Sequence, residues 1–143
     1  MLNFIHPYII AFIAVFGYAT MGAIAKKTLP DLPPLPFVVL SNVFIFIFAL
    51  ILTQIFEKDF SFSDMDTKAW IGVMVFSAIN IIAFGGYLFA LQFIPLVEYQ
   101  LIAVCIPIIG GLLGFFFLGE PIKIQYIIGF VFVAIGLYIA LKV

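Results

Sequence analysis

The sequence predicts an all-α integral membrane protein in which five transmembrane helices form a single domain over residues 1–143. Apolar side chains make up 66% of the chain and charged ones only 9%, whereas a soluble domain has about 45–50% and about 25%. The apolar residues also gather in long uncharged stretches that are continuous rather than alternating. Because lipid supplies no water to satisfy an open backbone, such stretches favour helices over a β-barrel.

Each stretch has a length suited to crossing a hydrocarbon core of about 30 Å, which takes roughly 20 helical residues. The five predicted spans are residues 7–25, 37–56, 69–94, 96–118 (interrupted only by Glu98) and 124–141. The first has no basic residue before it and no convincing cleavage site, so we expect a retained helix and not a signal peptide. The connections are too short to form a separate extramembrane domain.

The first two connections have clear breaking signals. Lys26 and Lys27 are expected to end the first span. A proline-rich linker that cannot continue a helix follows them, with Pro30, Pro33, Pro34 and Pro36. The second connection, residues 57–68, is the longest hydrophilic segment, and Trp70 is expected to anchor the next span at the membrane interface.

The last two connections are short. Pro95 stands in an otherwise apolar sequence, so the third and fourth spans are predicted to form a tight antiparallel hairpin. Gly119, Glu120 and Pro121 separate the fourth span from the fifth, and we expect Glu120 to be a mainly structural turn residue.

Charge and cysteine content exclude several functions. The net charge is −1 and no basic run is present, so nucleic acid is not the expected partner. The lone Cys105 has no His or acidic neighbours at metal-ligand spacing, so we expect no metal and no cofactor. His6, near the N-terminus, is expected to be interfacial, and no catalytic set of Ser, His and Asp or paired acids occurs within a span. The sequence therefore does not indicate an enzyme.

The lysines do not favour one orientation in the membrane. Five crossings place three lysines on each side, Lys58, Lys68 and Lys123 on one and Lys26, Lys27 and Lys142 on the other. The positive-inside rule depends on an asymmetry of Lys and Arg between short loops, and this chain has none. Either insertion is compatible with the sequence, or both, unless lipids, a partner chain or the first helix decides.

Polar side chains inside spans are costly, so each needs a partner. Asn80 lies near the middle of the third span and Asn42 about a third of the way along the second. Each could line a polar cavity and bind substrate, or hydrogen-bond a neighbouring helix. Tyr18 and Tyr87 are further candidates for contact with a ligand.

Glu98 is the only acid inside a predicted span, and Gln100 lies close to it. As a functional residue, Glu98 would attract a cationic group or carry a coupling proton. Its shallow position favours the alternative, an ionised, solvated carboxylate at the headgroup level. We include both residues among the candidate substrate-binding groups.

Small residues predict close helix contacts and bends. Gly110 and Gly114 form a small-xxx-small pair on the fourth span, and Gly129 and Gly136 share one face of the fifth. Pro107 removes a backbone donor at the centre of the fourth span and clashes with the Ala103 carbonyl, which predicts a kink. A second bending point is predicted in the third span, at Gly85 and Gly86.

The second half of the chain resembles a known transporter pattern. Its motifs are similar to the end of an EamA-like repeat of the drug/metabolite transporter superfamily. They are the run from Pro107 and Ile108 through Leu118, Gly119, Glu120 and Pro121, followed by Ile128, Gly129 and Gly136. The segment YLFALQFIP, residues 87–95, looks like that family's third-helix exit.

The resemblance implies transport of small metabolites or amphiphilic compounds through a central cavity by alternating access, in the inner cell membrane. Members of the superfamily typically contain two five-helix repeats of opposite orientation, and this sequence supplies one. Two copies inserted in opposite senses would rebuild that arrangement, so the leading hypothesis is an antiparallel homodimer, and the alternative is a complex with a second short membrane protein. Unlike the family's four-helix multidrug relatives, the first span has no acid, which does not favour proton-coupled cation export.

Two other functions are compatible with the same sequence. One is a subunit that flips a lipid-linked sugar, which would need a lateral opening between helices. The other is a non-transporting accessory subunit, which would have dry packing of Leu and Phe where a transporter has a cavity.

Overall fold

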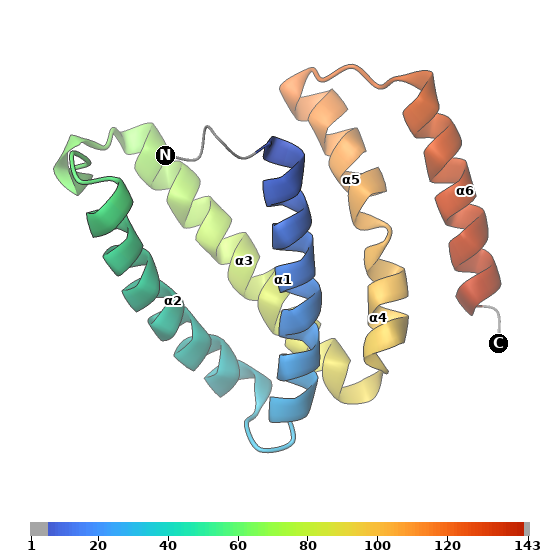
Figure 1. The fold of residues 1–143 in the computed structure, drawn as a ribbon, viewed down its shortest axis with the longest axis horizontal. Coiled ribbons are helices and arrows are strands. Elements are labelled where there is room, and N and C mark those ends of the chain that lie inside the picture. Colours follow the sequence, from blue (N-terminus) through green and yellow to red (C-terminus); the bar gives the residue numbers. More distant parts are fainter. Residues whose placement is uncertain (1–5, 142–143) are drawn as a thin grey trace. The chain divides into compact units, whose positions relative to one another are not determined.

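The computed structural model describes residues 6–141, and every regular element in that range is a helix (Figure 1). The all-helical prediction is therefore confirmed. The elements in chain order are α1 (Pro7–Thr28), α2 (Pro34–Phe56), a 3₁₀ turn η2 (Phe62–Asp64), α3 (Thr67–Phe93), α4 (Leu96–Ala103), α5 (Ile106–Leu113), a π-helical turn η3 (Gly114–Leu118) and α6 (Ile124–Leu141).

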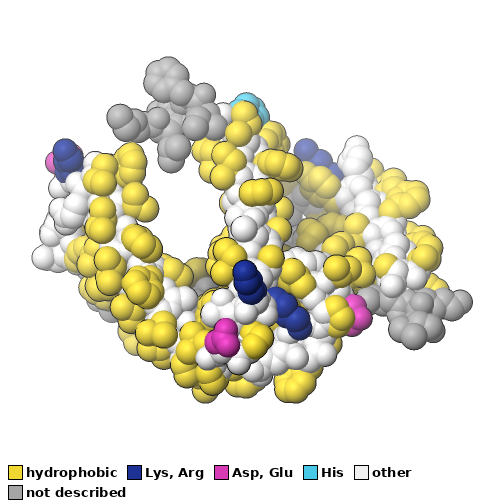
Figure 2. Space-filling model, turned by 60° about the horizontal axis from the view of Figure 1, so that its bottom comes forward, with side chains coloured by type: hydrophobic (Ala, Val, Ile, Leu, Met, Phe, Trp, Pro, Cys, Tyr) yellow, Lys and Arg dark blue, Asp and Glu magenta, His cyan; other side chains and the backbone are white. Residues whose placement is uncertain are grey.

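Four segments of the described chain are long and apolar enough to cross a membrane. They are α1, α2, α3 and the segment Leu96–Leu118 that contains α4, α5 and η3. Helix α6 is apolar but shorter. Figure 2 shows hydrophobic side chains over most of the visible surface, with lysine and acidic side chains in only a few places. This surface is suited to lipid and not to water.

The chain divides into two compact units at the end of α3. The first unit ends at Phe93 and contains α1, α2 and α3, and the second begins at Ile94 and contains α4, α5, η3 and α6. In the first unit, α3 contacts both α1 and α2. Helices α1 and α2 lie close together beside their linker and diverge toward the opposite end of the unit (Figure 1).

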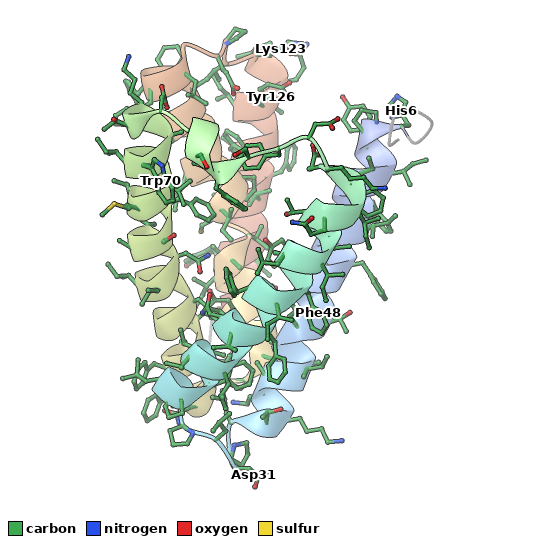
Figure 3. The ribbon with its side chains drawn as sticks, turned by 90° about the vertical axis from the view of Figure 1, so that its left-hand side faces the viewer. His6, Asp31, Phe48, Trp70, Lys123 and Tyr126 are labelled. Carbon is green, nitrogen blue, oxygen red and sulfur yellow. The ribbon has the colours of Figure 1, made fainter. Side chains whose placement is uncertain are left out.

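Local interactions define the starts of two helices in the first unit. Pro7 opens α1, and the His6 imidazole accepts a long hydrogen bond of 3.4 Å from the backbone N–H of Tyr8. The Asp66 carboxylate accepts a 2.8 Å bond from the backbone N–H of Ala69 in the first turn of α3. Figure 3 shows His6 and Asp31 at opposite ends of α1, with Trp70 near the start of α3.

Two predicted boundaries were wrong by about one helical turn. Lys26 and Lys27 do not end the first helix, because they lie in the last turn of α1, where a positive charge interacts favourably with the helix dipole. Pro34 and Pro36 belong to the first turn of α2 and not to the linker. The first turn of a helix has no intrahelical use for the N–H that proline lacks, so both residues fit there. Lys142, assigned from the sequence to one membrane side, lies outside the described residues.

The core of the first unit lies at one end only. Its most buried apolar side chains come from the end of α1 and its C-cap, the start of α2 and the end of α3: Ala25, Leu29, Val38, Leu88 and Leu91. Leu88 and Leu91 have no exposed surface. The three helices are thus packed together beside the α1–α2 linker, and most other side chains of the unit are exposed to whatever surrounds it.

The long segment of the second unit is interrupted as the sequence predicted. Helix α4 ends at Ala103 and α5 begins at Ile106, with a turn between them that is visible in Figure 1. Pro107 lies in the first turn of α5. An unbroken helix would need the N–H of Pro107 to bond the carbonyl of Ala103, and proline has no such group.

The π-helical turn η3 ends at a left-handed glycine. Gly119 has a φ of 68°, and the next N–H, of Glu120, donates to the carbonyl of Gly114 at 3.1 Å. The Glu120 side chain folds back over Gly114, where a Cβ atom would lie 2.7 Å from Oε2. The Gly-Glu turn is therefore built against Gly114, which is buried.

Within the second unit, one glycine of α5 makes a close interhelical approach. A Cβ atom on Gly111 would lie 3.2 Å from the ring of Phe130 on α6. By contrast, a Cβ atom on Gly110, Gly129 or Gly136 would meet nothing within 4 Å. These three glycines therefore do not pack closely against another helix within the described chain. Their contact with a second chain stays a prediction.

We expect Gly119→Ala to destabilise the protein by about 1 kcal/mol, because a side chain in the left-handed conformation clashes with its own backbone. The measurement is the Tm of the purified protein in detergent. Gly136→Ala is the matched control, since that helical position has open space for a methyl group. An unchanged Tm for Gly119→Ala, with the control also unchanged, would show that the turn is not under this constraint.

Candidate functional site

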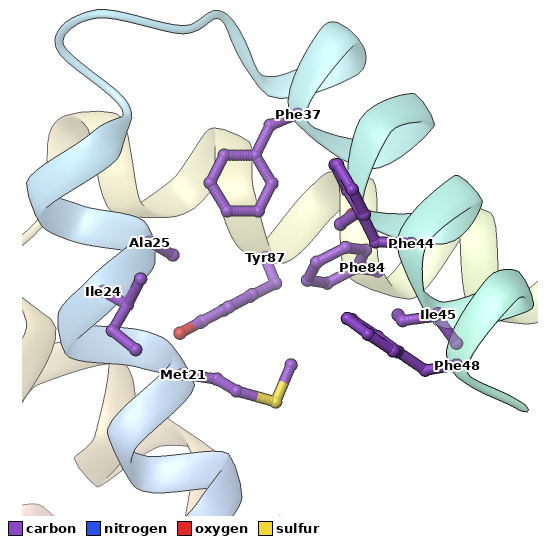
Figure 4. Close-up of a pocket in the computed structure, with 10 residues that line it drawn as sticks. Met21, Ile24, Ala25, Phe37, Phe44, Ile45, Phe48, Phe84 and Tyr87 are labelled. Carbon is purple, nitrogen blue, oxygen red and sulfur yellow. The ribbon is translucent and has the colours of Figure 1, made fainter. Parts of the chain in front are cut away.

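The first unit contains a cavity of about 280 Å³ between its three helices. Figure 4 shows the lining side chains converging from α1, α2 and α3. Helix α1 contributes Met21, Ile24 and Ala25, helix α2 contributes Phe37, Ser41, Phe44, Ile45 and Phe48, and helix α3 contributes Phe84 and Tyr87. Among these residues only Ser41 and Tyr87 carry a polar side-chain atom, so the site is suited to an apolar or aromatic group.

Helical periodicity explains why α2 supplies half of the lining. Phe37, Ser41, Phe44 and Phe48 follow one another at spacings of three or four residues. Residues at this spacing lie on one face of an α-helix. The stripe therefore faces α1 and α3 along nearly three turns of α2.

Aromatic contacts join α2 to α3 at the cavity. The Phe84 ring meets Phe37 edge-on, with centroids 6.3 Å apart and planes at 69°. It also stacks with Tyr87, one turn further along α3, at 6.3 Å and 24°. Both arrangements are among those that aromatic rings prefer. Phe84 is therefore the central ring of the aromatic wall.

A charged side chain joins α1 to α3 near the same end of the unit. The ammonium of Lys26 donates a hydrogen bond to the backbone carbonyl of Leu91, in the last turn of α3. That carbonyl belongs to the end of a helix, where the last four carbonyls have no intrahelical donor. Lys26 thus satisfies a carbonyl at the end of α3 and brings a positive charge to the negative end of the helix dipole.

Most small polar side chains of the spans bond to their own helix. The hydroxyls of Thr20, Thr53 and Ser77 each donate to the carbonyl four residues earlier, at 2.8–2.9 Å. Ser41 donates to the carbonyl of Val38 at 3.1 Å. Such bonds hide a hydroxyl from lipid without any contact to a second helix.

The four predicted site residues of the first unit fall in different environments. Tyr87 lines the cavity. Asn42 lies outside its lining, and its amide donates to the carbonyl of Val38 at 2.7 Å. Tyr18 is 72% exposed. Asn80 is also exposed, and no hydrogen bond of its amide is found within residues 6–141.

The two predicted site residues of the second unit lie on α4. Glu98 is exposed in the first turn of this helix, where a carboxylate interacts favourably with the helix dipole. Gln100 is half-buried two residues later. The binding of substrate by Glu98 and Gln100 stays a prediction.

The third span is not divided into separate helices at its predicted bending point. Helix α3 is continuous over 27 residues and passes through Gly85 and Gly86 without a break. Gly85 is buried and Gly86 is exposed, and a Cβ atom on either residue would meet nothing within 4 Å. A hinge at this pair stays a prediction, whereas the interruption beside Pro107 is present in the structure.

Sequence reasoning missed most of the cavity. Its four phenylalanines cannot be singled out by composition in a chain with 19 of them: Phe37, Phe44, Phe48 and Phe84. The periodic stripe of α2 was the available signal. Lys26 was assigned only to a helix end, and nothing in the sequence indicated that it bonds the end of α3.

The described residues do not group metal-binding side chains. No three His, Cys, Asp or Glu side chains between residues 6 and 141 are placed so that they could hold a metal ion. The lining of the cavity itself offers apolar contact and aromatic stacking.

The fold and this apolar cavity are those of a helical, multi-span membrane protein. The sequence model of the EamA-like transporter family matches residues 6–142, nearly the whole chain. The chain therefore belongs to the EamA-like transporter family, as its motifs indicated. Neither the curated proteins nor the solved structures include a match to it.

We expect Phe84→Ala to lower the free energy of unfolding by about 2 kcal/mol, because a half-buried ring that bridges α2 and α3 is lost. The measurement is the Tm in detergent. Phe76→Ala is the matched control on the same helix, since the Phe76 ring is 70% exposed. Equal effects of the two substitutions would contradict a bridging role for Phe84.

Proposed function

We propose that this protein transports small metabolites or amphiphilic compounds as a dimer of five-helix half-units that work by alternating access. Membership of the EamA-like transporter family over residues 6–142 carries the proposal. The cavity among α1, α2 and α3 supplies a place for the apolar part of a substrate.

The proposal includes a fifth span formed by α6. Its 18 residues rise about 27 Å at 1.5 Å each, close to the thickness of a hydrocarbon core. The chain would then cross the membrane an odd number of times. With three lysines on each side, the sequence has no charge bias against either insertion, which an antiparallel pair requires.

Asn80 supports a contact outside the single chain. Its amide lies mid-way along α3, is exposed, and has no hydrogen-bond partner in the described part of the chain. A polar group in that position costs free energy against lipid. A second half-unit, or a substrate held between two half-units, would offer the missing partner. Glu98 and Gln100 of α4 are proposed to face the same passage, and the interruption at Pro107 to let α4 and α5 move.

The test of transport begins with a thermal-shift screen of metabolites and amphiphiles on the purified protein. A compound at about 100 times its Kd raises stability by about 2.7 kcal/mol when it binds only the folded form. Compounds that raise Tm are then offered to vesicles that contain the protein. We expect at least one to accumulate faster than in protein-free vesicles. If every stabilising compound enters both kinds of vesicle at the same rate, the protein does not transport them.

The test of the antiparallel pair uses charge to fix orientation. Ser61→Lys with Ser63→Lys adds positive charge to the α2–α3 connection, whereas Asp31→Lys with two lysines appended after Val143 adds it to the opposite side. We expect a C-terminal reporter on the unchanged protein to be found on both membrane faces, and each charged variant to place it on one.

Copurification of two differently tagged chains gives the readout for pairing. Each charged variant should fail to copurify with a second copy of itself, and the two opposite variants should copurify when expressed together. A reporter on one face only in the unchanged protein, or copurification of like-oriented variants, would contradict the antiparallel homodimer.

A further inference from the structure

We infer that the cavity of the first unit binds the apolar part of a single-chain or single-ring carboxylate, and that Lys26 binds its carboxylate group. The inference deepens the proposed transport function and rests on it, because it names the class of substrate. It is drawn from the lining of the cavity, from the position of Lys26 and from the distribution of charge around both.

The size of the cavity suits a small apolar group. At about 280 Å³ it lies just below the range of small-molecule pockets. One short alkyl chain or one ring system fits this volume. The lining offers aromatic faces and a thioether, which suit apolar groups.

Lys26 is close along the chain to lining residues of both helices that it joins. On α1 it directly follows Ala25, whose side chain lines the cavity. On α3 its bonding partner, Leu91, lies one helical turn beyond Tyr87, which also lines the cavity. The four residues from Tyr87 to Leu91 correspond to a rise of about 6 Å. The flexible lysine stem can cover this distance, so the ammonium can approach a ligand that extends from the cavity.

The charge at this end favours an anion. The ten lining residues include no carboxylate. Lys26 and Lys27 stand together in the last turn of α1, and Asp31 in the following linker is the acid nearest to them in the sequence. A cationic amphiphile would be attracted by the aromatic rings, but its charge would be repelled by the two lysines. An anionic one meets the same apolar lining and a favourable charge.

The Leu91 carbonyl is the ligand that a carboxylate would replace. It is a neutral acceptor for the Lys26 ammonium. Exchange of this neutral carbonyl for a carboxylate adds attraction between two opposite charges to the hydrogen bond. Binding of a carboxylate would therefore draw the ammonium away from α3, and the α1–α3 contact would respond to the presence of substrate.

The test measures quenching of tryptophan fluorescence by two brominated probes of equal chain length, 11-bromoundecanoate and 11-bromoundecyltrimethylammonium. The protein, in dodecyl maltoside, carries Phe48→Trp and Trp70→Phe, so that its one tryptophan lines the cavity. The native protein, whose Trp70 lies outside the lining, reports partition of the probes into the micelle.

We expect saturable quenching by the carboxylate in the Phe48→Trp variant, and a gradual, unsaturable decrease for native Trp70. The trimethylammonium probe cannot form the charged bond to Lys26, so its concentration at half-saturation should be about tenfold higher. Lys26→Gln removes the same bond and should weaken carboxylate binding by about tenfold. Lys26→Arg should preserve carboxylate binding. Lys27→Gln, the matched control, removes a neighbouring charge but no bond to the carboxylate, so it should weaken binding much less than Lys26→Gln.

The inference is overturned if the trimethylammonium probe binds as well as the carboxylate, or if neither probe quenches saturably. It is also overturned if the Lys26→Gln variant binds the carboxylate as tightly as the protein that retains Lys26. The two probes are compared on the chain that retains Lys26, so poor folding of the Lys26→Gln variant would not obscure the result. These outcomes are independent of the vesicle test. Uptake of some other compound together with no carboxylate binding would remove the substrate class and leave the transport function in place.

Discussion

The contact between the ends of α1 and α3 is the feature on which the first unit depends. Leu88 and Leu91 are completely buried there, and the Lys26 ammonium bonds the Leu91 carbonyl beside them. Few other side chains of the unit are buried. The three helices are thus fixed at one end and diverge toward the other, and the cavity lies next to the fixed end. The cavity and the contact that holds the unit together therefore lie close to each other.

Positions of the helices could be predicted from the sequence because lipid imposes a strong local rule. A spanning helix needs a long apolar stretch, and polar or proline-rich segments interrupt these stretches almost where the helices end. The errors occurred at residues that are compatible with both a helix end and the linker. Lys26 and Pro34 were expected to lie outside the helices, yet a lysine suits the last turn of a helix and a proline the first.

The cavity could be predicted only in part, since it depends on how helices cross. Tyr87 was identified as a candidate and lines the cavity, but Phe84, which joins the two aromatic contacts, had no local signal. Asn42 illustrates the opposite case: a conspicuous amide that bonds its own helix. Periodicity along one helix shows which residues share a face, and it does not show which face meets another helix.

The distribution of hydrogen bonds distinguishes structural from functional polar groups in this chain. A hydroxyl that bonds the carbonyl four residues earlier, as Thr20 and Ser77 do, costs little in lipid and needs no second helix. Asn80 has no such bond in the described chain, and Lys26 bonds a carbonyl of another helix. A polar group contributes free energy to binding where it can exchange one partner for another or gain one that it lacks. On this criterion the proposed roles of Asn80 and Lys26 in recognition differ from the structural role of the hydroxyls, and only Asn80 was singled out from the sequence as a polar residue within an apolar span.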